Sequence, residues 1–333
     1  MEYDVMGIGN ALVDIEVRVD DAFVESLGVT KGGMTLYSLE DQKRVLEAVA
    51  SKAHKISSGG SAANTIHGIG ALGGKGYYLG RVADDEFGRH YTEDMRDCGV
   101  GFPGPDAAEH GTGTCVIMVT PDSERTMLTH LGISSNLHPD NVDATIVSKA
   151  RLVYIEGYLW TGEETREAAL KTAELAKKAG IPVAFTLSDA FVVNAFKNDL
   201  VDFIRWKVDI LFCNDIEARA LCGTENLEAA FEEMQAMTQT LLMTRGKQGS
   251  WATDSDNGRL EIGVFPVKAV DTTGAGDLFA AGTLYGLCRK RPLKEAAILG
   301  SYCAAQVVTH LGGRMPAHSH TDLKKILDLY PGP

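Results

Sequence analysis

The stretch DTTGAGDLFAAG, residues 271–282, decides the fold and the chemistry expected of this chain. It follows the apolar run VFPVKAV (264–270), which we predict as a strand, and it opens into the apolar segment 278–290, which we predict as a buried helix. The start of a helix exposes unpaired N–H groups and the positive end of the helix dipole. Because Gly274, Ala275 and Gly276 leave these groups uncovered, we predict that the amides of residues 274–277 bind an anion such as phosphate.

Asp277 needs an explanation of its own, because a carboxylate beside a phosphate site repels the phosphate. One explanation is that Asp277 removes the proton from a hydroxyl that attacks a phosphoryl group in line. The alternative is that Asp277 only caps the helix, which is a common role for aspartate. The small glycines beside it and the second aspartate, Asp271, favour catalysis.

The order of patterns along the chain predicts an α/β fold. Apolar runs at 151–157, 182–188, 209–214 and 240–246 alternate with helical patterns, which indicates a mostly parallel sheet with helices on both faces. Ligands of such sheets bind at the carboxyl ends of the strands. Two segments, 12–19 and 112–132, instead alternate apolar and polar residues with period two. We therefore expect a single domain over 1–333 with a small β-sheet lid formed by about 12–37 and 110–134.

Composition excludes several classes of partner. The 333 residues carry a formal net charge of −13, and Lys and Arg are scattered, so neither nucleic acid nor an anionic membrane surface is an expected partner. No P-loop pattern and no complete dinucleotide fingerprint is present. The six cysteines form no C-x-x-C pair and no signal peptide is evident, which predicts a cytoplasmic protein with reduced thiols.

Three motifs carry a resemblance to a known family: GGSAANTIHGIGALGG (59–74), NDIE (214–217) and the opening stretch. Along nearly its full length the chain resembles the ribokinase-like (PfkB) carbohydrate and nucleoside kinases, and within them the bacterial adenosine kinases. The resemblance implies a three-layer α/β/α fold with a small lid. It also implies transfer of the γ-phosphoryl group of ATP to a primary hydroxyl, most simply the 5′-hydroxyl of adenosine to give AMP.

The resemblance also implies roles for the residues around the phosphates. Asp277 would be the general base, and Gly274, Ala275 and Gly276 with the amide of Asp277 would form the anion hole. Arg125 would neutralise phosphate from the lid, although a solvated arginine in a hairpin turn is the alternative. Mg²⁺ would be held through water by Asn214 and Glu217. The alternative there is that Asn214 or Asp215 caps a helix and Glu217 is solvated.

Further roles are implied for the nucleotide and the substrate. Thr244, Gly246 and Gly249 would border the nucleotide, with residues 300–313 beside the adenine. Asp271 and Thr273 lie where the site for a monovalent cation such as K⁺ begins in many family members. Asp14 would accept hydrogen bonds from two ribose hydroxyls, or would be only a strand-end residue. The remaining substrate-binding candidates are Asn10, Gly59, Gly60, Ser61 and Asn64, of which Ser61 is favoured as a helix N-cap over a direct ligand.

The acceptor remains open between a nucleoside and a free sugar such as ribose or fructose. The GGSAANT form of the first motif favours a nucleoside, whose base needs an apolar slot. The lid offers a set of apolar side chains that would form either this slot or the lid's own core: Met34, Leu36, Cys115, Ile117, Met118 and Leu128. A catalytically silent nucleotide-binding regulator is the alternative of another class, and both a monomer and a homodimer are compatible with the sequence.

Overall fold

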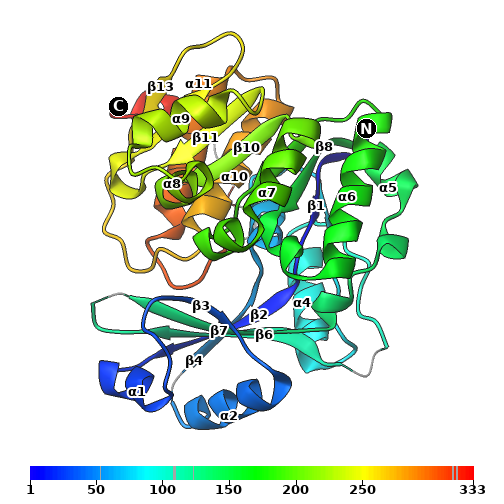
Figure 1. Ribbon diagram of the computed structural model, residues 1–333, viewed down its shortest axis with the longest axis vertical. Helices are drawn as coiled ribbons and strands as arrows, with labels where there is room; N and C mark the ends of the chain where they lie inside the picture. The colour runs from blue at the N-terminus through cyan, green and yellow to red at the C-terminus, as the bar shows by residue number, and fades with distance from the viewer. Residues whose placement is uncertain (53, 108–109, 123, 317–318, 320–321) are drawn as a thin grey trace.

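The computed structural model describes residues 1–52, 54–107, 110–122, 124–316, 319 and 322–333. The chain forms one large body around a central sheet and a smaller sheet below it (Figure 1). The large sheet has the strand order β13-β12-β11-β10-β9-β8-β1-β5. Neighbouring strands from β11 to β5 are parallel, whereas β12 pairs antiparallel with both β11 and β13. Its strands are β1 (Tyr3–Ile8), β5 (Gly76–Leu79), β8 (Ala150–Glu156), β9 (Val183–Thr186), β10 (Ile210–Asn214), β11 (Thr240–Thr244), β12 (Ser250–Thr253) and β13 (Leu260–Ile262).

Helices cover both faces of the large sheet, as the alternation in the sequence predicts. In β8, Leu152 and Tyr154 face the core shared with α3, α4 and α10–α12, whereas Val153 and Ile155 face the core shared with α5–α9. The three-layer α/β/α fold is therefore confirmed. These helices are α3 (Ser61–Ala71), α4 (Glu86–Asp97), α5 (Ala144–Ser148), α6 (Glu163–Lys178), α7 (Ala190–Lys207), α8 (Asp215–Cys222), α9 (Leu227–Gln235), α10 (Ala275–Cys288), α11 (Leu293–Val307) and α12 (Leu323–Leu329), with short 3₁₀ turns at Ile133–Asn136, Pro139–Asn141, Gly157–Thr161 and Gly246–Gln248.

The small sheet has the order β3-β7-β6-β2-β4, and β6 and β7 form the predicted hairpin. On its outer face, Val17, Val116 and Leu128 pack with residues of two further helices. Figure 1 shows these two helices on the side of the small sheet that faces away from the large body. Its inner face turns toward the large body and carries Asp14 and Ile117. The elements are β2 (Leu12–Arg18), β3 (Gly33–Leu36), β4 (His54–Gly59), β6 (Thr112–Val119) and β7 (Arg125–Gly132), with α1 (Asp21–Ser26) and α2 (Leu39–Val49).

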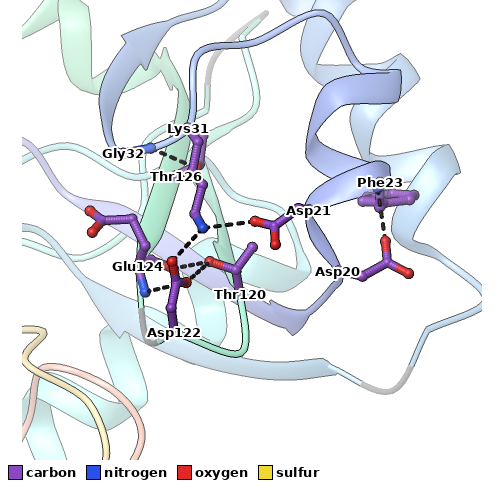
Figure 2. A network of polar contacts seen from close by, with 9 residues as sticks. All are labelled: Asp20, Asp21, Phe23, Lys31, Gly32, Thr120, Asp122, Glu124 and Thr126. Atoms are coloured by element: carbon purple, nitrogen blue, oxygen red, sulfur yellow. Dashed lines mark hydrogen bonds and ion pairs between the residues drawn. The ribbon is translucent and has the colours of Figure 1, made fainter.

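A network of polar contacts holds the free end of the β6–β7 hairpin (Figure 2). Lys31 points between two carboxylates, and its Nζ lies 2.7 Å from Asp21 of α1 and 2.5 Å from Asp122 of the turn. The Thr120 hydroxyl donates to Asp122, and the Gly32 amide donates to the Thr126 hydroxyl. These contacts join α1, the approach to β3 and the start of β7. Residue 123 of the predicted turn lies outside the described residues.

Two local predictions differ from the structure. Residues 264–270 form no strand; they run as an irregular segment after β13, with Val264 and Val267 partly exposed. The strand β4 was not predicted, because its sequence, HKISSG, is polar and lacks an apolar alternation. Among the described residues, no helix is both long and apolar enough to cross a membrane.

Candidate active site

A cavity of about 380 Å³ lies between the large body and the inner face of the small sheet. The last residues of four neighbouring parallel strands line it: Glu156, Thr186, Asn214 and Thr244. The carboxyl ends of parallel strands meet at one edge of a sheet, so the cavity lies where ligands of this architecture bind.

Asp277 lies in the first turn of α10 and lines this cavity. Its Oδ1 accepts a hydrogen bond from the Ser61 hydroxyl at 2.7 Å, and its Oδ2 accepts one from the Asn64 amide at 3.0 Å. The N-cap of α10 is Gly274, which makes no side-chain capping bond, so the Asp277 carboxylate does not cap the helix. Burial raises the pKa of Asp277 to about 6, while the bonds from Asn64 and Ser61 oppose the rise. Most of this carboxyl is therefore ionised at pH 7, as a base must be.

The turn before α10 packs so closely against the Gly313 backbone that position 274 has no room for a side chain. Gly274 has φ of 73°, in the left-handed region, and a Cβ there would lie 2.5 Å from the carbonyl oxygen of Gly313. Ala275 N–H donates to the Thr272 carbonyl at 3.3 Å, so this amide is already engaged. The amides of Gly276 and Asp277 begin the helix, where no helical carbonyl lies four residues back.

Arg125 reaches from β7 to this same turn. Its guanidinium donates to the Thr273 hydroxyl, and its Nε lies 3.9 Å from Oδ1 of Asp271. The side chain lines the cavity and is only partly exposed, which contradicts a fully solvated hairpin arginine.

Asp271 is buried and bonded through both oxygens. Its Oδ1 accepts from the amide and hydroxyl of Thr273, and its Oδ2 accepts from the Gly312 amide at 2.9 Å. With Arg125 nearby, protein donors already balance this carboxylate. Oδ2 of Asp271 still keeps a further lone pair beside its bond from Gly312, so the monovalent-cation site at Asp271 and Thr273 stays a prediction.

Asp14 projects from the inner face of β2 into the same cavity. Burial raises its pKa to about 7, although Arg314 and Arg125 act to lower it. Gly59 makes room for this carboxylate, because a Cβ on Gly59 would lie 2.1 Å from Oδ2 of Asp14. Asn10 also lines the cavity, and its buried Oδ1 has no hydrogen-bond partner among the described residues. Both side chains thus offer acceptors to the cavity.

Ser61 and Gly60 differ from the sequence expectation. The N-cap of α3 is Gly60, with φ of 95°, and Ser61 is the first helical residue. The prediction that Ser61 caps α3 is wrong, because its hydroxyl donates to Asp277 instead. Gly60, Ser61 and Asn64 all line the cavity.

Asn214 and Glu217 bond to each other at the start of α8. Asn214 Oδ1 accepts from the Glu217 amide at 2.8 Å, and Glu217 accepts from the Asn214 backbone and side-chain amides at 3.0 and 2.7 Å. Asn214 therefore caps α8, but Glu217 is buried rather than solvated. Burial raises the pKa of Glu217 to about 8, and the neighbouring Asp189 and Asp215 raise it further. A cation bound through water would relieve this clustered acidity, so the pair fits Mg²⁺ in that manner. No three His, Cys, Asp or Glu side chains are grouped to hold a metal ion, as far as the structure describes the chain.

A second cavity, of about 390 Å³, lies on the other side of the α10 start. It is lined by Thr244, Gly246 and Gly249 and by residues of α11 such as Ala304, in the segment predicted to flank an adenine. Gly249 has φ of 79°, and a Cβ there would lie 2.0 Å from the Ile262 carbonyl oxygen. The two cavities share the residues Thr244, Thr272, Ala275, Gly276 and Phe279.

Comparison with known sequences agrees with this arrangement. The sequence model of the family described as "pfkB family carbohydrate kinase" matches residues 22–319. The chain belongs to this family. It is a phosphotransferase with an alcohol group as acceptor, like its characterised relatives.

Relatives of this pfkB family kinase include both nucleoside and sugar kinases. The chain is 37% identical to a solved adenosine kinase from Sinorhizobium meliloti, with a TM-score of 0.90 over 96% of this chain and 98% of that one. It is 36% identical to a probable sugar kinase from Rhizobium etli CFN 42, with a TM-score of 0.92 over 98% and 99%. The adenosine kinase of Saccharomyces cerevisiae is 27% identical over 331 residues, covering 93% of this chain and 96% of that protein. A 5-dehydro-2-deoxygluconokinase from Shouchella clausii is 28% identical over 287 residues, covering 81% and 86%.

The predicted apolar slot of this pfkB family kinase divides between two faces of the small sheet. Met34, Leu36, Cys115 and Ile117 line the first cavity. Met118 and Leu128 do not; they are fully buried under α1 and α2 in the small sheet's own core. The side-chain period of two in a strand places neighbours such as Ile117 and Met118 on opposite faces.

Glu156 is one residue of this site that the sequence analysis missed. It is fully buried, and its two oxygens accept from the backbone amides of Asn10 and Ala62, both at 2.7 Å. It thereby joins β8 to the loop after β1 and to the start of α3. The available signal was a glutamate ending an otherwise apolar strand, RLVYIEG.

Proposed function

We propose that this kinase transfers the γ-phosphoryl group of ATP to the 5′-hydroxyl of a ribonucleoside, with adenosine as the preferred acceptor. The supporting observation is that two cavities meet at the start of α10, where they share Ala275 and Gly276. Of the two cavities, Asp277 lines only the one between the large body and the small sheet. A nucleotide in the second cavity would then direct its terminal phosphate at a hydroxyl held beside Asp277.

In this mechanism Asp277 accepts the proton of the attacking hydroxyl as the new O–P bond forms and the bond to ADP breaks. The amides of Gly276 and Asp277 stabilise the negative charge on the transferring group from the helix end. Arg125 lies close enough to the turn to contribute positive charge as well. Asn214 and Glu217 would hold Mg²⁺ through water, and the ion would neutralise charge on the phosphates.

The small sheet would act as the lid of the site. Its inner face supplies Asp14 and Arg125 to the cavity, so a movement of this sheet against the large body would change the shape of the site. Closure would exclude water, which otherwise competes with the hydroxyl as phosphoryl acceptor.

Two observations support a nucleoside as acceptor. The apolar side chains of Met34, Leu36 and Ile117 line the same cavity as Asp14 and could contact the base of a nucleoside. Asp14 and Asn10 present acceptors suited to the vicinal hydroxyls of a ribose. A sugar kinase is the second candidate, favoured by the similarity to the Shouchella clausii 5-dehydro-2-deoxygluconokinase.

A coupled assay of ADP release tests the proposal. The purified protein is supplied with ATP and Mg²⁺ and with adenosine, other nucleosides, ribose, fructose or phosphorylated sugars. We expect kcat/KM for adenosine to exceed that for every free sugar by at least about tenfold, since the apolar slot adds binding energy only to a nucleoside. Activity confined to sugars would overturn the acceptor but leave the transfer chemistry in place.

A further inference from the structure

The segment Leu311–Arg314, after α11, contacts residues of the small sheet, of the turn before α10 and of α3. The Leu311 carbonyl accepts from Lys55 of the small sheet at 2.6 Å, and the Gly312 amide donates to Asp271. Gly313 packs against Gly274, as described above. Arg314 then contacts Asn64, the residue that donates to Asp277. Successive residues thus support the lid, the anion-binding turn and the base.

Arg314 is held between an acceptor and an ion pair. Its Nε donates to Oδ1 of Asn64 at 3.2 Å, and its Nη1 donates to Oδ2 of Asp94 on α4. The guanidinium also lies over the Tyr91 ring, 5.3 Å from the centroid. Its side chain is only 9% exposed, and Arg314 is absent from the lining of both cavities. Any contact effect of Arg314 on the reaction must therefore pass through its neighbours, while its charge also acts through space and lowers the pKa of Asp277 and of Asp14.

The amide of Asn64 can satisfy both partners in only one orientation. Arg314 offers donors and no acceptor, so it requires the oxygen of the amide. An ionised Asp277 offers acceptors and no donor, so it requires the NH₂ group. Rotating the Asn64 amide by half a turn would set two donors against each other and two acceptors against each other.

We propose that Arg314 is a positioning residue of phosphoryl transfer, which fixes the Asn64 amide so that its NH₂ group faces the Asp277 carboxylate. Asp94 anchors Arg314 in turn. The four residues form a hydrogen-bonded chain. The Asp94 carboxylate accepts from Arg314, Arg314 donates to the oxygen of the Asn64 amide, and the NH₂ group of that amide donates to Asp277, so each contact fixes the orientation of the next group. This role of Arg314 rests on the proposed role of Asp277 as the base.

Other groups also face Asp277 and bear on its ionisation. Positive charge comes from Arg125 on β7 and from Arg314 itself, and Ser61 donates from α3. The remaining titratable groups that act on or are acted on by Asp277 are Asp14 on β2, Tyr154 and Glu156 on β8, Tyr158 in the turn after β8 and Glu217 on α8. A test of Arg314 must therefore separate its geometry from its charge.

The substitution Arg314→Lys makes this separation, because lysine keeps the charge but lacks the planar fork that reaches Asn64 and Asp94 together. We expect kcat to fall about tenfold, as for a misdirected general base, while the KM values for ATP and acceptor change less than about threefold. Arg81→Lys is the matched control, since Arg81 also bonds a carboxylate, Asp106, and a carbonyl, that of Asn136, and neither partner contacts Asp277. It should leave kcat within about twofold, as is usual for a charge-conserving change at a surface pair.

A double-mutant cycle identifies the route of the effect. In an Asn64→Ala background, Arg314→Lys should change kcat by less than about twofold, because coupled residues are not additive. An equal tenfold loss in both backgrounds would overturn the proposal, and so would wild-type kcat in the single variant. If Arg314→Lys lowers the folded yield, Asp94→Asn, which releases the same guanidinium, should give the same loss of kcat and the same dependence on Asn64.

A readout without substrate keeps this proposal distinct from the proposed function. In protein labelled with ¹⁵N at asparagine, the side-chain resonance of Asn64 should shift with pH as Asp277 titrates, with a midpoint near the pKa of about 6. Arg314→Lys should reduce the amplitude of this shift at least about twofold, since the NH₂ group no longer faces the carboxylate. An unchanged titration would overturn the role of Arg314, whereas absence of kinase activity with a normal wild-type titration would overturn only the proposed function.

Discussion

Asp14 on β2 and Gly59 on β4 are diagonal neighbours, since Gly59 pairs with Leu12, and the Asp14 carboxylate lies so close that a Cβ on Gly59 would be 2.1 Å from its Oδ2. The strand pair therefore fixes where the carboxylate points, and it points into the cavity. Gly59→Ala should displace Asp14 and raise the KM for the acceptor at least about tenfold, the equivalent of one good hydrogen bond to a charged group. The KM for ATP should stay unchanged. Gly258→Ala is the control, because a Cβ there meets nothing within 4 Å.

Asp277→Asn should lower turnover to a small residual rate and leave ATP binding nearly intact. The variant keeps the side-chain volume but cannot accept a proton, and one of its two ends opposes a donor from Ser61 or Asn64. A positioned general base contributes about 10² to 10⁴ in rate, so kcat should fall by that order. Calorimetric titration with ATP checks binding. Near wild-type phosphorylation by the variant would refute the assigned base.

The pH dependence follows from the pKa of Asp277, which burial raises to about 6. The base works only when deprotonated, so its titration should lower kcat/KM about tenfold per pH unit below pH 6. The carboxyls of Asp14 and Glu217, whose pKa values burial raises to about 7 and about 8, add changes of their own above this acid limb. A stopped ADP-release assay across pH 5–9 measures the profile. The residual rate of Asp277→Asn should lack this limb. A profile that rises toward low pH would contradict the assignment of Asp277.

The sequence predicted the parts of the site that are contiguous along the chain. The turn before α10 and the start of α8 are short motifs, and each brings its own residues together by local geometry. The contacts between motifs were not predictable. Glu156 bonds Asn10 across 146 residues and Arg314 bonds Asn64 across 250, and no local pattern encodes such pairs.

Local sequence patterns also gave wrong or missing strand predictions for two segments, one that lines a cavity and one that lies at a sheet edge. The segment 264–270 is apolar because Val264, Phe265 and Val267 line the second cavity, not because it pairs in the sheet. The polar strand β4 pairs with β2 at the edge of the small sheet, where half of its residues are exposed. Apolarity alone could not distinguish a ligand-binding wall from a strand.

Filling the second cavity should weaken nucleotide binding alone. Ala304 of α11 lines it, and a phenylalanine at this position would occupy space between α11 and Phe265. Ala304→Phe should raise the KM for ATP at least about tenfold, because ordered apolar sites tolerate added volume poorly. The KM for the acceptor should change less than about twofold, as for a residue that does not contact the acceptor, because Ala304 does not line the other cavity. Each KM is measured with the other substrate saturating. A rise in both KM values would contradict the division between the cavities.

Glu156→Gln should destabilise the protein and impair acceptor binding together. Both oxygens of Glu156 accept backbone N–H bonds, from Asn10 and Ala62, and glutamine can serve only one of them. The amide that loses its acceptor is buried, so the free energy of unfolding should fall by about 1–3 kcal/mol. Urea unfolding at constant m-value measures the loss. Glu174→Gln, on the exposed face of α6, should have a free energy of unfolding within about 0.5 kcal/mol of wild type.

The hydrogen bond from the Asn10 amide to Glu156 also holds the Asn10 backbone in the cavity wall, so Glu156→Gln should raise the KM for the acceptor as well. A loss of stability without a change in this KM would mean that Glu156 supports only the fold.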